Sequence, residues 1–306
     1  MKVHKKILTL IPTLDASADL PDLLQMLRSQ TIPTDILVID SASEDATVGI
    51  AESFGCEVVQ IERSAFNHAM TRNIALQYEA DYYLFMTQDA LPVDGMLIAA
   101  LLEPFSDSDV VAAYARQLPG EEADAIERFA RETNYPATSM IKSKESLAEL
   151  GIKTFFCSNS CAIYRGDYFR EVGGFTEGLI MNEDMEYAAR AILSGQKVAY
   201  AAGAKVWHSH VYGAGDIFRR YFDIGIFFRT NAWIMQEVNR YTSTESTGAA
   251  QATRELAYLL RHAPLSLPRS LLFSLTKYSA FKLGYRYEQL PRSLVRRFSL
   301  HRNFHA

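Results

Sequence analysis

Three aspartates stand at the ends of predicted strands or helices, where a carboxylate could do chemistry: Asp40, Asp89 and Asp184. Asp40 and Asp89 each follow a short apolar run typical of a strand that is buried on both faces. Ligands of open α/β sheets bind at the carboxyl ends of the strands, so we expect these two carboxylates to lie near each other. A carboxylate at that edge is suited to hold a divalent metal ion against phosphate oxygens.

Each carboxylate also has a structural alternative. Asp40 is either a turn or capping aspartate, or an acceptor for a nucleobase N–H or a ribose hydroxyl. Glu183 and Asp184 open a predicted amphipathic helix, where acidic residues stabilise the helix dipole. Asp184 borders the buried face of that helix, and a carboxylate in such a place can act as a general base toward a substrate hydroxyl.

Two histidines and one arginine are further candidates. His208 and His210 are two residues apart, so on a strand both would face the same side, either as a metal pair or as hydrogen-bonded structural residues. Arg72 is either a surface charge or a phosphate clamp. The chain has no GxxxxGK[ST] motif and no GxGxxG after its first predicted strand, which argues against P-loop phosphate binding and NAD-type dinucleotide binding.

The elements that must position these residues alternate between strands and helices. Apolar runs predict strands over residues 7–14, 36–39, 56–61 and 82–86, and helical spacing predicts helices over 17–30, 43–54 and 67–80. This alternation over the first 115 residues predicts a mainly parallel sheet covered on both sides. Further along, we expect a helix over 182–193 with Asn182 as its cap, a strand over 197–207, and a mostly helical chain from 215 onward.

Composition sets limits on the class of protein. The chain has 306 residues, 48% of them hydrophobic, which is enough for one large or two modest cores. No apolar run reaches the roughly 18–20 residues that cross a bilayer, and the amino terminus lacks the pattern of a signal peptide. Cys56, Cys157 and Cys161 make no disulfide framework and are expected to be small buried hydrophobes. A cytoplasmic location is the default expectation.

The charge is unevenly distributed. Residues 253–306 hold ten Lys or Arg and two Asp or Glu, whereas the first 252 residues hold 21 basic and 34 acidic ones. A basic tail on an acidic body suggests an anionic partner at the tail. The acidic body argues against nucleic acid.

The tail also carries an apolar face, interspersed with the basic residues Lys277, Lys282 and Arg286. That face comprises Leu267, Leu271, Leu272, Leu275 and Tyr278. Its helices could pack on the rest of the chain or on a second copy in a homodimer. Alternatively, they could lie on an anionic lipid surface.

Seven segments, in this order, resemble the family-2 inverting glycosyltransferases of GT-A fold. They are Ile11–Thr13, Ile39–Thr47, Asn67–Asn73, Thr87–Asp89, Val172–Phe175, Asn182–Asp184 and Val206–His208. The resemblance implies an α/β, Rossmann-like fold with a mainly parallel sheet and flanking helices, plus a helical C-terminal extension. It places the GT-A domain at 1–212, with a nucleotide-binding half at about 1–115 and an acceptor-binding half at about 116–212. Residues 213–306 are then the helical, basic region that meets a membrane surface or a second subunit.

The same resemblance implies a role for each matching residue. Asp184 matches the general base of the family, paired with Glu183. His208 is expected beside the metal or diphosphate, with Trp207 and His210 on the acceptor and diphosphate side. The nucleotide sugar is expected on Pro12, Thr13, Asp15, Asp40, Ser41, Arg72, Asn73, Gln88 and Asp89.

One departure from the family pattern concerns the metal. The usual DxD reads Thr87-Gln88-Asp89 here, so its first carboxylate is missing. Mg²⁺ or Mn²⁺ would rest on Asp89, His208 and the diphosphate oxygens. Alternatively, Gln88 donates a hydrogen bond to the diphosphate, in a site that depends less on metal.

Within the family, the chain looks most like bacterial rhamnosyltransferases that use dTDP-L-rhamnose. The residues that carry this likeness are Ser158–Cys161, Trp207–His210 and Arg220–Gly225. The likeness implies transfer of L-rhamnose from dTDP-β-L-rhamnose to a saccharide acceptor, lipid-linked and at the inner face of the plasma membrane, with an α-rhamnoside as product of inversion. The alternatives are another donor, such as a UDP-hexose, or a weakly active nucleotide-sugar-binding subunit of a polysaccharide assembly complex.

Overall fold

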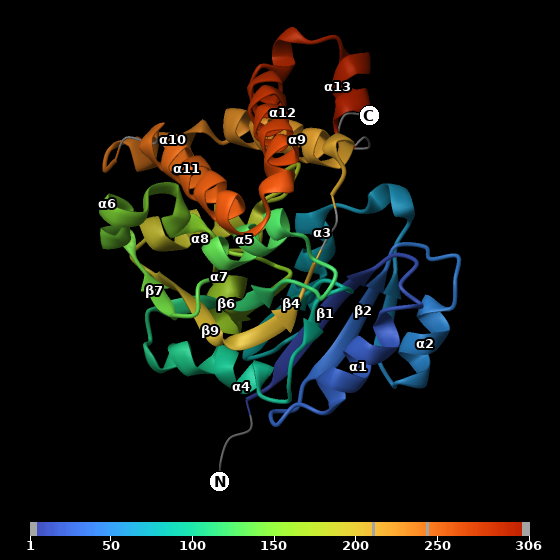
Figure 1. Ribbon diagram of the computed structural model, residues 1–306. Helices are drawn as coiled ribbons and strands as arrows, with labels where there is room; N and C mark the ends of the chain where they lie inside the picture. The colour runs from blue at the N-terminus through green and yellow to red at the C-terminus, as the bar shows by residue number, and fades with distance from the viewer. Residues whose placement is uncertain (1–4, 210–211, 243–244, 302–306) are drawn as a thin grey trace.

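The computed structural model describes residues 5–209, 212–242 and 245–301, and in these residues one nine-stranded sheet forms the centre of the molecule (Figure 1). Its strands follow the order β3–β2–β1–β4–β8–β6–β9–β5, and β7 also pairs with β9. Their bounds, in that order, are Glu57–Gln60, Asp35–Asp40, Ile7–Thr13, Tyr82–Met86, Cys161–Arg165, Val110–Leu118, Lys197–Trp207 and Leu91–Pro92, with Met140–Lys142 for β7.

The predicted strand directions hold for the first half of the sheet. β1 pairs in parallel with β2 and β4, and β2 pairs in parallel with β3. The second half is mixed, since β8 runs antiparallel to β4 and β6, whereas β6 and β9 are parallel. The mainly parallel α/β sheet is therefore confirmed, with antiparallel strands inserted after β4.

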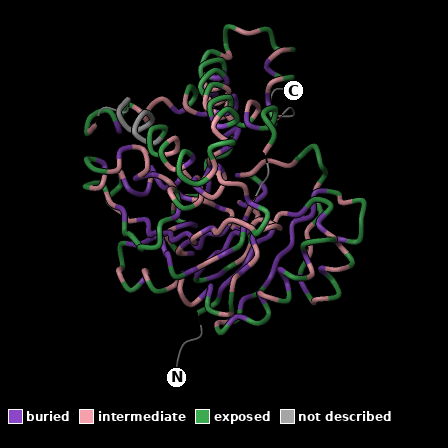
Figure 2. The backbone as a smooth tube through the Cα atoms, in the orientation of Figure 1, coloured by how far each residue is buried: buried purple, intermediate pink, exposed green. Residues whose placement is uncertain are grey.

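Helices lie on both faces of the sheet (Figure 1), and most residues of its strands are buried (Figure 2). In β4, Tyr82, Leu84 and Met86 join one apolar cluster, and Tyr83 and Phe85 join the other. The first cluster is covered by α1 (Leu20–Arg28), α2 (Thr47–Ser53) and α4 (Leu97–Leu102). The second is covered by α3 (His68–Asn73), α7 (Gly166–Glu171) and α8 (Glu183–Leu193).

Two predicted helices differ in detail from the structure. The helix predicted over 67–80 ends at Asn73 and continues as a 3₁₀ turn over Ile74–Gln77. Asn182 takes the N-cap position of α8, but its backbone is left-handed, with φ 60°, and its side chain makes no capping hydrogen bond. The three cysteines are buried and unpaired, as predicted.

The predicted helical extension is confirmed and packs against the rest of the molecule. It comprises α9 (Ala214–Thr230), α10 (Ala232–Asn239), α11 (Glu245–His262), α12 (Leu267–Tyr285) and α13 (Arg292–Phe298). Buried residues of α9, among them Phe222 and Ile226, belong to the same apolar cluster as β4 and α8. α9 and α12 lie very close, since a Cβ on Gly284 would come within 1.9 Å of Phe222 O.

The region between the sheet and these helices adds α5 (Ala125–Asn134) and α6 (Leu147–Leu150). Among the residues that the structure describes, no helix combines the length and the apolar character needed to cross a membrane. The boundary predicted at residue 212 stays a prediction.

Candidate active site

A cavity of about 770 Å³ opens at the carboxyl ends of β1 and β4 and extends to the C-terminal helices. Its volume is typical of a site for a small ligand. Of the predicted site residues, those in its wall are Pro12, Thr13, Ser41, Arg72, Gln88, Asp89, Glu183, Asp184 and His208. The structure thus brings residues from the first 90 positions together with the start of α8 and the end of β9.

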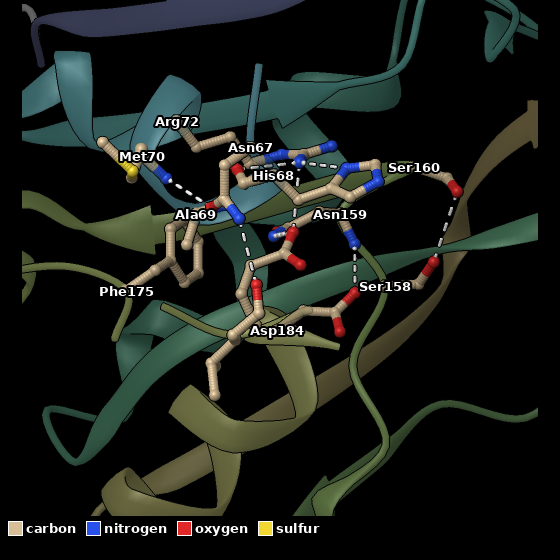
Figure 3. Close-up of polar contacts among 12 residues, drawn as sticks. Asn67, His68, Ala69, Met70, Arg72, Ser158, Asn159, Ser160, Phe175 and Asp184 are labelled. Atoms are coloured by element: carbon tan, nitrogen blue, oxygen red, sulfur yellow. Dashed lines mark hydrogen bonds and ion pairs between the residues drawn. The ribbon is translucent and has the colours of Figure 1, made fainter. Parts of the chain in front are cut away.

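Asp184 is held at the start of α8 by two backbone groups, of which Figure 3 shows that of Asn159. Its Oδ2 accepts a hydrogen bond from Asn159 N at 2.9 Å, and its Oδ1 accepts one from Met185 N at 2.8 Å. The neighbouring Glu183 is buried, and its Oε1 accepts from Asn159 Nδ2 at 3.0 Å and from Arg72 Nη1 at 3.1 Å. Asn159 therefore ties the two carboxylates together.

The two carboxylates differ in their pKa values. Burial, reinforced by the charge of Glu183, raises the pKa of Asp184 to about 7, against the opposing effect of its backbone hydrogen bonds. Burial would also raise the pKa of Glu183, but the charge of Arg72 and the bond from Asn159 outweigh it and lower that pKa. A carboxylate that titrates near neutral pH is suited to accept a proton, whereas Glu183 stays ionised as the partner of Arg72.

Asp89 and His208 form a second polar pair in the cavity wall. Gln117 Oε1 accepts hydrogen bonds from Arg131 Nη1 and from His208 Nδ1, the latter at 2.8 Å. An arginine can only donate, so the Gln117 atom facing both residues is oxygen, and we assign the proton of His208 to Nδ1. His208 Nε2 lies 3.4 Å from Asp89 Oδ1. The proton on Nδ1 leaves Nε2 as the ring nitrogen that could bind a cation.

This arrangement fits a divalent cation to a limited extent. A carboxylate oxygen and an imidazole nitrogen, the latter oriented by Gln117, are suitable ligands. Within the described part of the chain, however, no group of three or more His, Cys, Asp or Glu residues is placed to hold a metal ion. Asp89 and His208 would thus supply two of the ligands of a metal ion here.

Gln88 binds the backbone at the end of β1. Its Oε1 accepts from Leu14 N at 2.9 Å, and its Nε2 donates to Leu14 O at 3.2 Å. An amide side chain can donate and accept at once, whereas a carboxylate can only accept, so this pairing requires glutamine. The residue thereby fastens the end of β4 to the end of β1.

Asp40 is fully buried behind Ser41, outside the cavity wall. Its carboxylate accepts from Thr13 Oγ1 at 3.1 Å and from Ser43 N at 2.9 Å. Asp15 also lies outside the wall, where it accepts from Glu44 N at 2.9 Å and pairs with Arg63 at 3.1 Å. Both aspartates shape the loops after β1 and β2, and their predicted contact with a nucleotide stays a prediction.

The remaining predicted residues lie apart. Asn73 uses its amide on the backbone of Phe175, with Nδ2 donating to O and Oδ1 accepting from N, both at 2.9 Å. Trp207 is 42% exposed at the end of β9, and neither it nor Asn73 is in the cavity wall. His210 lies outside the described residues.

Asn159 and Gln117 are the site residues that the motifs do not single out as functional. Asn159 orients both acidic residues of α8, and Gln117 orients His208. Asn159 stands in a polar triplet just before the buried strand β8, which is the one local signal that could have indicated it. Gln117 is placed by pairings 14, 41 and 91 residues away, so no local pattern could reveal it.

The chain matches the family model described as glycosyl transferase family 2 over residues 9–173. It is 40% identical over 303 residues to the O-antigen chain rhamnosyltransferase RfbN of Salmonella typhimurium, covering 98% of this chain and 96% of that one. It is also 40% identical over 274 residues to the O-antigen chain rhamnosyltransferase WbaN of Salmonella anatum, covering 89% and 86% of the two chains.

Solved structures share the fold at low sequence identity. The mannosyltransferase PcManGT from Pyrobaculum calidifontis, in complex with GDP-Man and Mn²⁺, matches with a TM-score of 0.63 and 14% identity, over 94% of this chain and 89% of that one. TarS of S. aureus, residues 1–349 in complex with UDP-GlcNAc, matches with a TM-score of 0.54 and 16% identity, over 96% and 84%.

Proposed function

This chain belongs to glycosyl transferase family 2 and is a glycosyltransferase, and we propose that it transfers L-rhamnose from dTDP-β-L-rhamnose to a lipid-linked saccharide in the synthesis of a bacterial surface polysaccharide. Identity of 40% to two O-antigen chain rhamnosyltransferases, over almost the whole chain of one of them, is the observation that carries this proposal. The geometry at Asp184 supports an active enzyme over a subunit that only binds nucleotide sugar.

The proposed reaction is a single displacement. An acceptor hydroxyl oxygen bonds to the anomeric carbon while the bond from that carbon to the diphosphate oxygen breaks on the opposite face. The electron pair leaves with dTDP, and Asp184 takes the hydroxyl proton. Its raised pKa, about 7, suits it to this exchange near neutral pH. Such general base catalysis contributes about 10²–10⁴-fold to a rate.

Glu183 and Arg72 keep Asp184 in place for that step. Arg72 Nη1 donates to Glu183 at 3.1 Å, and Asn159 links Glu183 to Asp184. The negative charge of Glu183 also contributes to the raised pKa of Asp184. Glu183 thus tunes and orients the base without accepting the proton itself.

Asp89 and His208 would hold Mg²⁺ or Mn²⁺ together with the donor diphosphate. Their facing oxygen and nitrogen atoms, 3.4 Å apart, support this assignment, as does the Mn²⁺ named with the Pyrobaculum mannosyltransferase. When bound, the ion would neutralise charge on the departing diphosphate. Gln88 supports the site through the backbone of Leu14.

The exposed face of α12 supports contact with a membrane surface, where a lipid-linked acceptor would lie. Leu271, Leu272, Leu275 and Tyr278 are 51%, 54%, 67% and 64% exposed, respectively. On the adjoining face, Lys277 reaches into the cavity wall. An apolar face flanked by basic residues is typical of a helix that lies on anionic lipid.

The donor test is turnover of the purified protein with dTDP-rhamnose, set against UDP-hexoses, with a detergent-solubilised lipid-linked saccharide extract as acceptor. Transfer of rhamnose alone supports the proposal. Transfer of a hexose from a UDP donor, or binding of dTDP-rhamnose without turnover, would replace it with one of the two alternatives.

The membrane test is co-sedimentation with anionic vesicles. Leu275→Glu should reduce binding, and Met96→Glu, at a residue that is 53% exposed and far from α12, serves as the control. Equal binding of the two variants would show that α12 does not mediate binding to the vesicles.

A further inference from the structure

We propose that the C-terminal segment Ser299–His301 is a positioning element of the active site, anchored by Asp223 and holding His68 against the Arg72–Glu183 pair. This inference rests on the proposed function for its kinetic consequence. It assigns a role to Asp223, the aspartate of the Arg220–Gly225 segment, which takes no part in the chemistry proposed at Asp184 and Asp89.

The anchor is a buried carboxylate on α9. Asp223 is fully buried, and its Oδ2 accepts from Leu300 N at 2.9 Å and from His301 N at 3.4 Å. His301 N also donates to Ser299 Oγ at 2.9 Å, and Ser299 is fully buried. The segment after α13 is therefore held by its backbone, in a bent conformation around one side chain.

The anchored segment delivers an aromatic ring to the cavity wall. The His301 and His68 rings meet edge to face, with centroids 5.1 Å apart and planes at 84°. His68 lines the cavity at the start of α3. An edge-to-face contact favours one relative orientation of the two rings.

His68 in turn helps to orient Arg72, and through it the carboxylates of Glu183 and Asp184. Arg72 Nη1 lies 3.3 Å from His68 Nδ1, 3.2 Å from His68 O and 3.1 Å from Glu183 Oε1. Because arginine only donates, His68 Nδ1 is the acceptor, and burial keeps its ring neutral by lowering its pKa to about 4. From Glu183, the path runs through Asn159 to Asp184.

The anchor does more than pack the C-terminus. α13 is already fixed by Phe298, whose ring contacts Phe218 and Phe222 at centroid distances of 5.2 and 5.7 Å. Burying a carboxylate is costly unless its hydrogen bonds are fully met. Asp223 Oδ1 has no hydrogen-bond partner in the described structure, so the bonds from Leu300 N and His301 N compensate the burial of this carboxylate only in part.

The first test compares four variants with the full-length wild type. His301→Ala should lower kcat by about tenfold to a hundredfold, since small misplacements of a catalytic group have effects of this size. His301→Phe keeps an edge-to-face ring and should restore most of the rate. Asp223→Ala should resemble His301→Ala, whereas Asp223→Asn keeps an accepting oxygen and should lie near the wild type.

The matched control is His262→Ala. His262 also stacks on an aromatic ring of the C-terminal region, Tyr258, at 4.4 Å, but it lies outside the cavity wall. Its loss should leave kcat unchanged. If His262→Ala and His301→Ala lower kcat equally, or if the loss in His301→Ala follows only the fraction of protein that is unfolded, the positioning role is overturned.

The second test needs no substrate, so it separates this inference from the proposed function. Hydrogen exchange at the Asn159 and Met185 amides, which both donate to Asp184, should be faster in His301→Ala and Asp223→Ala than in the wild type. Unchanged exchange at both amides would overturn the proposal, whatever sugar the enzyme transfers.

Discussion

The cavity wall carries two polar groups, Asp184 with Glu183 at one end and Asp89 with His208 at the other end, and they are built in different ways. At one end, both oxygens of Asp184 accept backbone hydrogen bonds, and Glu183 beside it is buried and paired with Arg72. At the other end, the side chain of Asp89 is 32% exposed and faces His208 at 3.4 Å. The protein alone completes the proposed proton-accepting end, whereas a ligand would complete the proposed leaving-group end at Asp89 and His208.

The proposed reaction would therefore depend on the protein alone at Asp184, and on the substrate as well at Asp89 and His208. The protein itself holds Asp184 in place, which suits the preorganised base that we propose. The position of a metal at Asp89 and His208 would be set only when diphosphate oxygens join them. A substitution of Asp184 should therefore lower the catalytic rate, whereas a substitution of Asp89 should weaken binding of the diphosphate.

The largest expected effect is at the completed end. Asp184→Asn removes the proton acceptor but keeps an oxygen that can accept one of the backbone bonds, so kcat should fall by about 10²–10⁴-fold. The affinity for dTDP, measured by calorimetry, should stay close to that of the wild type. Turnover near the wild-type rate would place the base elsewhere.

The next effect is at the incomplete end. Asp89→Asn should weaken dTDP binding in the presence of Mn²⁺ by more than about tenfold, in the range seen when metal sites lose supporting groups. In EDTA, the variant and the wild type should bind dTDP alike, because the metal-dependent part of the affinity is then absent from both. Equal affinities in Mn²⁺ as well would mean that Asp89 holds no metal with the diphosphate.

The pH dependence of kcat tests whether the charge of Glu183 acts on Asp184. With the pKa of Asp184 at about 7, kcat should rise as pH increases through 7, because only the ionised carboxylate accepts a proton. The charge of Glu183 is one cause of that raised pKa. Glu183→Gln should therefore move the acidic limb of the pH–rate profile to lower pH. A limb that stays in place or moves upward would contradict the coupling of the two carboxylates.

The sequence predicts features that depend on local patterns, whereas features that depend on distant contacts stay open. β4 was predicted over its observed bounds, Tyr82–Met86, because an apolar run with a polar end is a local signal. The carboxyl edge of a parallel sheet predicts only that Asp40 and Asp89 lie near each other, and Asp40 lies outside the cavity wall. The family resemblance, and not the sheet edge, implies one site for Asp89, Asp184 and His208. All three line the cavity.

The contacts that orient these groups could not be predicted. Asn159 reaches 24 and 25 residues along the chain to Glu183 and Asp184, and Asp223 reaches 77 residues to Leu300. Such pairings depend on the tertiary fold, and the residue type alone leaves their partners open. The same limit applies to Gln88, whose partner Leu14 is 74 residues away.

The smallest effect is expected at Gln88, and it separates two roles for this residue. If Gln88 only fastens Leu14, Gln88→Met loses two hydrogen bonds, which together contribute about 1–3 kcal/mol to stability. The affinities for dTDP and for thymidine should then fall by the same small factor, because the loop after β1 loosens as a whole. Gln236→Ala, at an exposed amide on α10, is the control and should change neither affinity. If Gln88 instead donates to the diphosphate, dTDP binding alone should weaken while thymidine binding is kept. That result would move Gln88 from the support of the leaving-group end into direct contact with the donor.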